Sequence, residues 1–254
     1  MKRMIFTVLI ALLVCVFPAN SQTATPTVTT KADSAQTLPK LKVGTVYAPE
    51  LKIPSNALHQ FNEGNKDYNA SRYEEAAEHF KLASRMYPKY SRAYASLAMA
   101  LLRINRFGES HKAIEVAIGL DKNSVDAVLA LGVLYFRESK YSESEAQLQR
   151  VVAVLPHEPS ARQVLSAIAV LRSDYTEVIK QTDAIEEKDA AQHSIAFVIR
   201  GVALEKLGFV GEADACYERY LHFGRKGRKK LEEARAAILQ LSAGTNEDKM
   251  EAAN

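Results

Sequence analysis

The chain has 254 residues and a formal net charge of +3, from 33 Lys and Arg against 30 Asp and Glu. Its 47% hydrophobic and 25% charged residues are typical of a globular protein. Eleven Gly and eight Pro are too few for a collagen-like or low-complexity chain, and two Cys exclude a disulfide scaffold. The near-neutral charge argues against a dedicated nucleic-acid binder, so we expect a soluble, mostly helical protein.

The N-terminal segment is typical of an export signal. Two cations precede an apolar run over residues 4–17, whose 14 residues are fewer than the ~20 of a membrane-spanning helix. Ala19 and Ser21 then supply the small residues of a signal-peptidase site. We therefore interpret residues 1–21 as a signal peptide cleaved after Ser21, with an uncleaved anchor as the alternative. Export would place the protein in a bacterial periplasm.

The two cysteines have different expected fates. Cys15 follows Val14, where a lipoprotein signal requires a small residue, so lipid anchoring at Cys15 is not favoured. Cleavage removes Cys15 and two cations, which leaves a mature charge of 31 − 30 = +1. Cys216 is then the single thiol, so no disulfide forms within the chain, and we expect a buried, inert side chain.

Residues 22–56 form a Thr/Pro-rich lead with seven Thr and four Pro and no apolar periodicity. Such a segment cannot bury enough surface to order itself, so we expect a linker that is mostly disordered. A short strand over residues 41–47 is the alternative for part of it.

From Ala57 the sequence repeats with a period of 34 residues, in the blocks 57–90, 91–124 and 125–158. Apolar residues at helical spacing predict two amphipathic helices in each block. Small residues recur where the two helices would approach, and aromatic residues recur at the start of the second helix: Gly64, Ala98 and Gly132, then Tyr73, Phe107 and Tyr141. Pro88 and Pro156 would end the second helix.

The period continues less regularly in the blocks 159–192 and 194–227, with one inserted residue near 186–194. The fourth block departs most from the pattern, so we expect a bend or a softer region there. Residues 228–241 form a further amphipathic segment, interpreted as a capping helix over the last repeat. Residues 242–254 are polar and aperiodic, and we expect a disordered tail.

These residues resemble the tetratricopeptide repeat (TPR) family. The match includes Leu131-Gly132 followed by Tyr135, and the first block supplies Gly64, Ala76, Phe80, Ala83 and Pro88. The resemblance implies an all-α solenoid, a right-handed superhelix of five helix-turn-helix repeats over residues 57–227. It also implies a non-enzymatic module that binds protein partners.

In the TPR family the first helix of each repeat lines a concave groove that binds a peptide or a helix of a partner. Carried over to this chain, the resemblance implies a groove of Phe61, Asn65, Tyr68, Arg92, Met99, Arg103, Phe136 and Arg137. Further groove positions would be Asn69, Leu102, Asp126, Leu129, Val133, Gln163, Ala167, Val198 and Val202. Arg103 and Arg137 would grip a carboxylate, whereas apolar members such as Leu102 have core packing as the alternative. The carboxylate clamp of heat-shock cochaperones is not matched, because only Asn65 fits it.

The strongest charge run consists of Arg225, Lys226, Arg228, Lys229 and Lys230. These cations lie just before the capping helix and in its first turn, where positive charge opposes the helix macrodipole. Contact with an anionic lipid surface or an acidic partner is one interpretation, and a solvated corner is the other.

Catalytic and metal-binding patterns are not found in the sequence. The six His are at least 20 residues apart, and no nucleophile elbow or glycine-rich phosphate loop is present. We therefore expect no enzyme activity, cofactor or metal, and no nucleic-acid partner.

The predicted function is a protein-interaction scaffold of the cell envelope, with two alternatives: an assembly factor for outer-membrane or pilus machinery, and a non-catalytic subunit of an exported enzyme. The sequence does not predict an oligomeric state.

Overall fold

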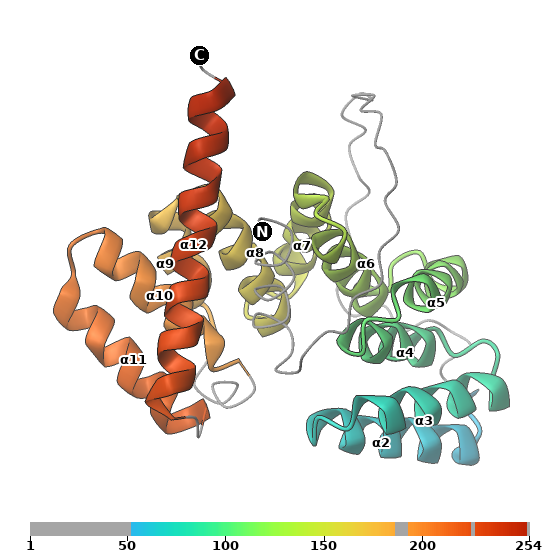
Figure 1. Cartoon of the computed structure of the whole chain (residues 1–254). Coiled ribbons are helices and arrows are strands. Elements are labelled where there is room, and N and C mark those ends of the chain that lie inside the picture. Colours follow the sequence, from blue (N-terminus) through green and yellow to red (C-terminus); the bar gives the residue numbers. More distant parts are fainter. Residues whose placement is uncertain (1–51, 186–192, 225–226, 253–254) are drawn as a thin grey trace.

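The structure, a computed structural model, describes residues 52–185, 193–224 and 227–252. The predicted signal peptide 1–21, Cys15, most of the 22–56 lead, Arg225 and Lys226 lie outside these ranges. Within the described residues the chain forms eleven α-helices and no strand. Five helix pairs come first and a single long helix follows (Figure 1). They are α2 Ser55–Asn69, α3 Tyr73–Met86, α4 Ser91–Arg103, α5 Phe107–Leu120, α6 Val125–Arg137, α7 Tyr141–Val154, α8 Pro159–Leu171, α9 Tyr175–Asp183, α10 Ile195–Lys206, α11 Val210–Gly224 and α12 Arg228–Ala252.

The pairs stack side by side into an all-α solenoid, as the period of 34 predicts. The first helices α4, α6 and α8 begin at residues 91, 125 and 159, one period apart. Each first helix packs on its own second helix and on the pair before it: α4 contacts α3 and α5, and α6 contacts α4, α5 and α7. A continuous core therefore runs from pair to pair rather than closing within one.

The two helices of a pair approach closely because a small residue on the first faces a large one on the second. A Cβ atom added at Gly64 would lie 2.7 Å from the ring of Phe80, and one at Gly132 would lie 2.7 Å from Leu148. The hydroxyl of Ser144 donates a 2.8 Å hydrogen bond to the Gly132 carbonyl, which satisfies both polar groups at the same contact. The recurrence of small residues in the sequence thus reflects helix-to-helix contact.

The turn inside each pair has one residue in the left-handed region, and it always stands at the same place in the repeat. These residues are Ser71, Asn105, Ser139, Ser173 and Gly208, with φ between 57° and 89°. The turn folds back on the first helix, since the Arg106 amide donates to the Leu101 carbonyl at 2.9 Å. This six-to-one bond is the helix C-terminal arrangement that a left-handed residue permits.

The fourth pair has the shortest helix that the structure describes, α9, with nine residues. Thr182 stands there where the first pair has Phe80, and its hydroxyl bonds back to the Val178 carbonyl at 2.9 Å. Because Thr182 is smaller than Phe80 and its hydroxyl bonds to its own helix, it contributes less to the contact between α8 and α9. The inserted residue is predicted near 186–194, of which 186–192 lie outside the described ranges.

Helix α12 differs from the prediction in length and in position. Its 25 residues run from Arg228 to Ala252, so the expected end at 241 is wrong, and residues 242–252 are helical rather than disordered. Its buried face carries Leu231, Ala234 and Ile238. Helix α12 packs on α10 and α11 and also contacts α8 of the fourth pair. Its C-terminal end projects beyond these helices (Figure 1). The buried face extends at least to Ser242, one residue beyond the expected end of the helix.

Candidate functional site

The first helices of the pairs present the predicted groove positions on one surface, which we call the inner face. On α2 and α4, Asn65 and Met99 are half-buried and Arg92 is exposed. Arg92 lies 3.4 Å from Asp126 of α6, an ion pair between equivalent positions of successive repeats. This part of the inner face combines apolar surface with charged groups that solvent can reach.

Several predicted groove residues are buried instead, among them Leu102 and Val133, at 0% and 3% exposed, and two aromatic residues. Phe61 is 6% exposed and Phe136 is 2% exposed. Phe61 packs against the rings of Phe80 and Tyr90, with ring centres 5.5 and 5.0 Å away. Phe136 packs on Tyr141 at 5.8 Å. A partner has no access to these rings, so their place in the predicted groove is corrected to the core.

Arg103 and Arg137 each stand at the end of a first helix and reach back to the preceding pair. The guanidinium of Arg103 lies 4.6 Å from the ring centre of Tyr73 and donates to its hydroxyl. The guanidinium of Arg137 lies 5.2 Å from the ring centre of Phe107. Stacked, half-buried guanidinium groups of this kind join successive repeats through cation–π contact. The structure therefore gives both side chains a packing role, and the carboxylate grip stays a prediction.

Tyr68, the remaining predicted groove residue, belongs to the same aromatic contact. Its ring meets the ring of Tyr73 edge-on, with centres 5.2 Å apart, and its side chain is half-buried at the end of α2. Tyr68 thus supports the turn between α2 and α3 and keeps a partly exposed edge.

The inner face is closed at the fourth and fifth pairs. The groove positions Val198 and Val202 of α10 are both 0% exposed, and Ala167 of α8 is buried as well. Helix α12 packs against both of these helices. The open part of the inner face therefore lies on α2 and α4 and at the start of α6.

The described cations of the predicted charge run are Arg228, Lys229 and Lys230, and all three are exposed. Lys230 pairs with Glu233 at 2.9 Å, and its hydrogen bond holds the pKa of that carboxyl below its usual range. Arg228 lies 3.9 Å from Glu218. Part of this positive charge is therefore balanced by neighbouring carboxylates.

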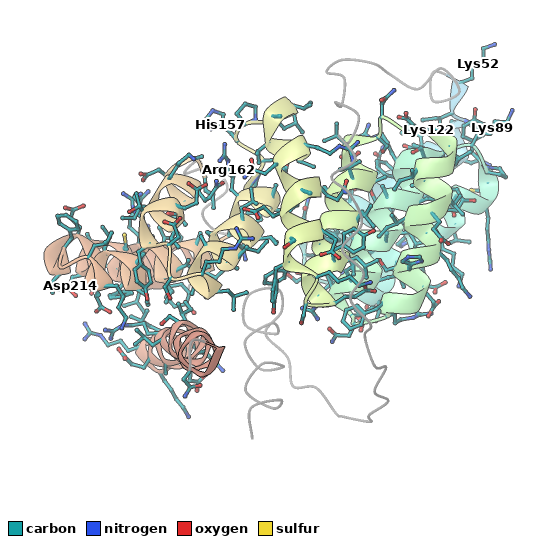
Figure 2. All side chains as sticks on the ribbon, turned by 90° about the horizontal axis from the view of Figure 1, so that it is seen from above. Lys52, Lys89, Lys122, His157, Arg162 and Asp214 are labelled. Carbon is teal, nitrogen blue, oxygen red and sulfur yellow. The ribbon has the colours of Figure 1, made fainter. Side chains whose placement is uncertain are left out.

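Exposed cations also mark one edge of the solenoid, which the sequence analysis did not identify. Lys89 and Lys122 stand in the turns between successive pairs, and Lys52 precedes α2 (Figure 2). In that view the three side chains project from the same edge. The signal for this edge is a Lys near the end of each of the first two blocks.

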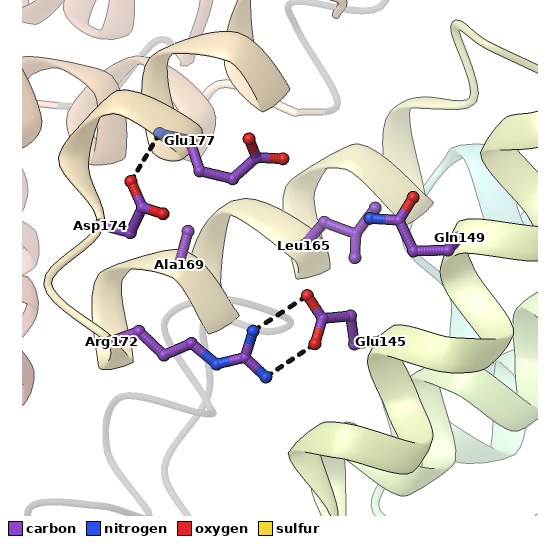
Figure 3. A pocket seen from close by; sticks show the side chains of 7 residues that line it. All are labelled: Glu145, Gln149, Leu165, Ala169, Arg172, Asp174 and Glu177. Carbon is purple, nitrogen blue, oxygen red and sulfur yellow. Dashed lines mark hydrogen bonds and ion pairs between the residues drawn. The ribbon is translucent and has the colours of Figure 1, made fainter. Parts of the chain in front are cut away.

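A cavity of about 200 Å³ between α7, α8 and α9 was also missed (Figure 3). Its lining includes Glu145, Leu165, Ala169, Arg172, Asp174 and Glu177. Arg172 grips Glu145 through two hydrogen bonds of 3.0 and 2.7 Å, and this bonding raises the pKa of the guanidinium. Three carboxylates and one guanidinium thus surround a small apolar floor.

The described ranges contain neither a cluster of metal ligands nor a membrane-spanning helix. No group of three His, Cys, Asp or Glu side chains is placed there to hold a metal ion. Among the helices of those ranges, none is both long and apolar enough to span a bilayer.

Comparisons with known proteins agree with the repeat geometry. A family model described as tetratricopeptide repeat matches residues 61–125 and 97–159. Sperm-associated antigen 1 of Mus musculus is 26% identical over 127 residues, which are 50% of this chain. The chain spans only 14% of the length of that curated relative.

Solved structures show the same solenoid. A thermophilic TPR protein of Thermus thermophilus superposes with a TM-score of 0.57 at 16% identity, covering 72% of this chain and 99% of that one. The pilF protein of Pseudomonas aeruginosa gives a TM-score of 0.54 at 13% identity, covering 75% of this chain and 88% of its own. At these identities the likeness concerns the fold alone.

Proposed function

We propose that this chain, a tetratricopeptide-repeat protein by its family match and its fold, is a non-catalytic scaffold of the cell envelope that binds a peptide or helix of a partner. Tetratricopeptide repeats act in general as protein-interaction modules. The binding surface of this proposal is the open part of the inner face, on α2, α4 and the start of α6.

The observation that carries the proposal is a difference in solvent exposure along the inner face. At equivalent repeat positions, Asn65 and Met99 are half-buried, whereas Val133, Ala167 and Val202 are buried. Met99 offers adaptable apolar surface, and the Arg92–Asp126 pair beside it offers both charges. A surface with apolar anchors between charged groups suits an amphipathic helix or an extended peptide.

The proposal is tested by placing a charge in the middle of this surface. Met99→Glu should abolish recovery of the partner in a pull-down after in-cell crosslinking, because a carboxylate replaces the central apolar contact. Val116→Glu is the matched control, since Val116 is 42% exposed on the second helix α5, away from the inner face. Equal recovery with both variants, each with an unchanged helical spectrum, contradicts the proposal.

Export to the periplasm is a separate part of the proposal and rests on the sequence. The cations before residues 4–17 and the small residues Ala19 and Ser21 support a cleaved signal. Mass spectrometry of the protein from fractionated cells should find Gln22 as the first residue. A protein that retains residues 1–21, or one that carries lipid on Cys15, contradicts this part and supports a membrane-tethered assembly factor instead.

A further inference from the structure

The cavity between α7, α8 and α9 exists because the fourth repeat lacks a large side chain. Ala169 of α8 occupies the repeat position that Leu101 holds in α4 and Tyr135 holds in α6, at intervals of 34 residues. Loss of a large side chain at a packed position leaves a void whose neighbours fill it only in part. The second and third repeats therefore show which side chains can fill this space, whereas the first repeat has Asp67 at this position.

The charge of the adjoining turn is inverted in the same repeat. The residue just before the second helix is Arg72, Arg106 and Lys140 in the first three pairs, and Asp174 in the fourth. In the third pair the Lys140 ammonium lies 5.6 Å from the ring centre of Tyr135. The fourth pair thus lacks both the large side chain and the ammonium, and has a carboxylate beside the vacated space.

The lining is complementary to a cation with an aliphatic stem. Leu165 and Ala169, 4% and 5% exposed, form an apolar floor one helical turn apart on α8. Figure 3 shows Asp174 and Glu177 on one side of this floor and the Arg172–Glu145 pair on the other. Three carboxylates and one guanidinium line the cavity, and the Lys180 ammonium pairs with Glu177 at 3.0 Å, so the formal charge around it is 2 − 3 = −1.

We propose that this cavity binds a lysine side chain of a partner protein. The methylene stem lies on Leu165 and Ala169, and the ammonium lies between the carboxylates of Asp174 and Glu177. The net negative lining disfavours an anionic group, and the apolar floor matches the stem that a lysine buries below its charge.

This site is distinct from the inner face. Ala167, an inner-face position, is two residues from both Leu165 and Ala169, so its side chain points away from theirs on α8, at about 100° per residue. The lysine site therefore does not depend on the proposed groove, and either can fail while the other holds.

The test is a titration followed by amide chemical shifts on ¹⁵N-labelled protein. The probe is Nα-acetyl-lysine methylamide, and its neutral partner is Nα-acetyl-norleucine methylamide, which has the same stem without the charge. The lysine probe should produce saturable shifts at residues 145–149 and 165–177, with the millimolar Kd expected of so small a ligand. Equal shifts with the neutral probe, or no saturable shifts with lysine, overturn the proposal.

Substitutions in the lining test whether the lysine probe binds in the cavity. Ala169→Leu restores the residue of the second repeat and should abolish binding, because the side chain occupies the space. Glu177→Gln should weaken binding about threefold, as expected for one partly exposed ion pair. Glu143→Gln, one repeat earlier and exposed, is the matched control and should leave the Kd unchanged.

Asp174→Asn keeps the capping ability of this residue at the start of α9, where its carboxylate accepts from the Glu177 amide at 3.0 Å. This variant decides the matter if Ala169→Leu disturbs the fold. A Kd that is unchanged in both Asp174→Asn and Glu177→Gln overturns the proposal.

Discussion

The close approach of the two helices within a pair predicts that a Gly→Ala substitution has opposite effects on stability at Gly132 and at Gly119. At Gly132 a new Cβ atom would lie 2.7 Å from two atoms of Leu148, which is 0% exposed. Carbon atoms prefer about 3.5–4.0 Å, so Leu148 must move by about 1 Å within a packed core. At Gly119, near the end of α5, the same Cβ atom has no neighbour within 4 Å.

The magnitudes separate the two variants. Gly119→Ala should stabilise the protein by about 0.5 kcal/mol, because alanine loses less backbone freedom on folding. Gly132→Ala makes a similar gain and also overpacks the contact, at a cost of about 1–3 kcal/mol. Its net effect is a loss of about 0.5–2.5 kcal/mol, and the difference between the variants is the overpacking cost itself.

Thermal unfolding followed by circular dichroism measures this difference. At about 2–4 °C per kcal/mol for a chain of this size, Gly119→Ala should raise the Tm slightly, and Gly132→Ala should lower it by several degrees. If Gly132→Ala raises the Tm as much as Gly119→Ala does, the close-approach argument is refuted.

Three further predictions concern the turns, a buried hydroxyl and the thiol. Gly208→Ala should lower the free energy of unfolding by about 1–2 kcal/mol in urea titrations, because Gly208 has a φ of 89°; no loss would contradict the strain argument. Ser110→Ala should cost about 1 kcal/mol in the same assay, since its buried hydroxyl donates to the Ala98 carbonyl at 3.0 Å. An unchanged midpoint of the urea titration would show that this hydrogen bond contributes nothing to stability. Burial raises the pKa of the Cys216 thiol, so less thiolate is present at a given pH, and iodoacetamide should alkylate it slowly until urea unfolds the protein. Equal native and unfolded rates by mass spectrometry would be inconsistent with a buried thiol.

Much of the fold is predictable from the sequence because helix contact imposes a strict residue pattern. Gly132 must be small where Leu148 is large, and the same pairing recurs in the first repeat, at Gly64 with Phe80, and in the fifth, at Gly201 with Tyr217. The turn positions were predictable too, had the recurrence of Ser, Asn and Gly before each second helix been used. The full length of α12 was not predictable from the sequence, because its polar C-terminal half gives little apolar periodicity.

The candidate site was less predictable, for a physical reason. The side of a first helix that faces the groove also borders the neighbouring first helix, so adjacent positions alternate between surface and core. Phe136 is buried while Met99, at another position of the same face, stays partly exposed. The lysine site depends on a missing side chain at Ala169, which becomes visible only when the repeats are compared position by position.

The most direct test of the central claim places a photo-crosslinking amino acid at single positions in cells. Crosslinkers at Asn65 and Met99 on the inner face should capture the same partner, whereas those at Leu82 and Val116, exposed on the second helices, should not. Capture from the second-helix positions, with none from Asn65 and Met99, would contradict the proposal that the inner face binds the partner.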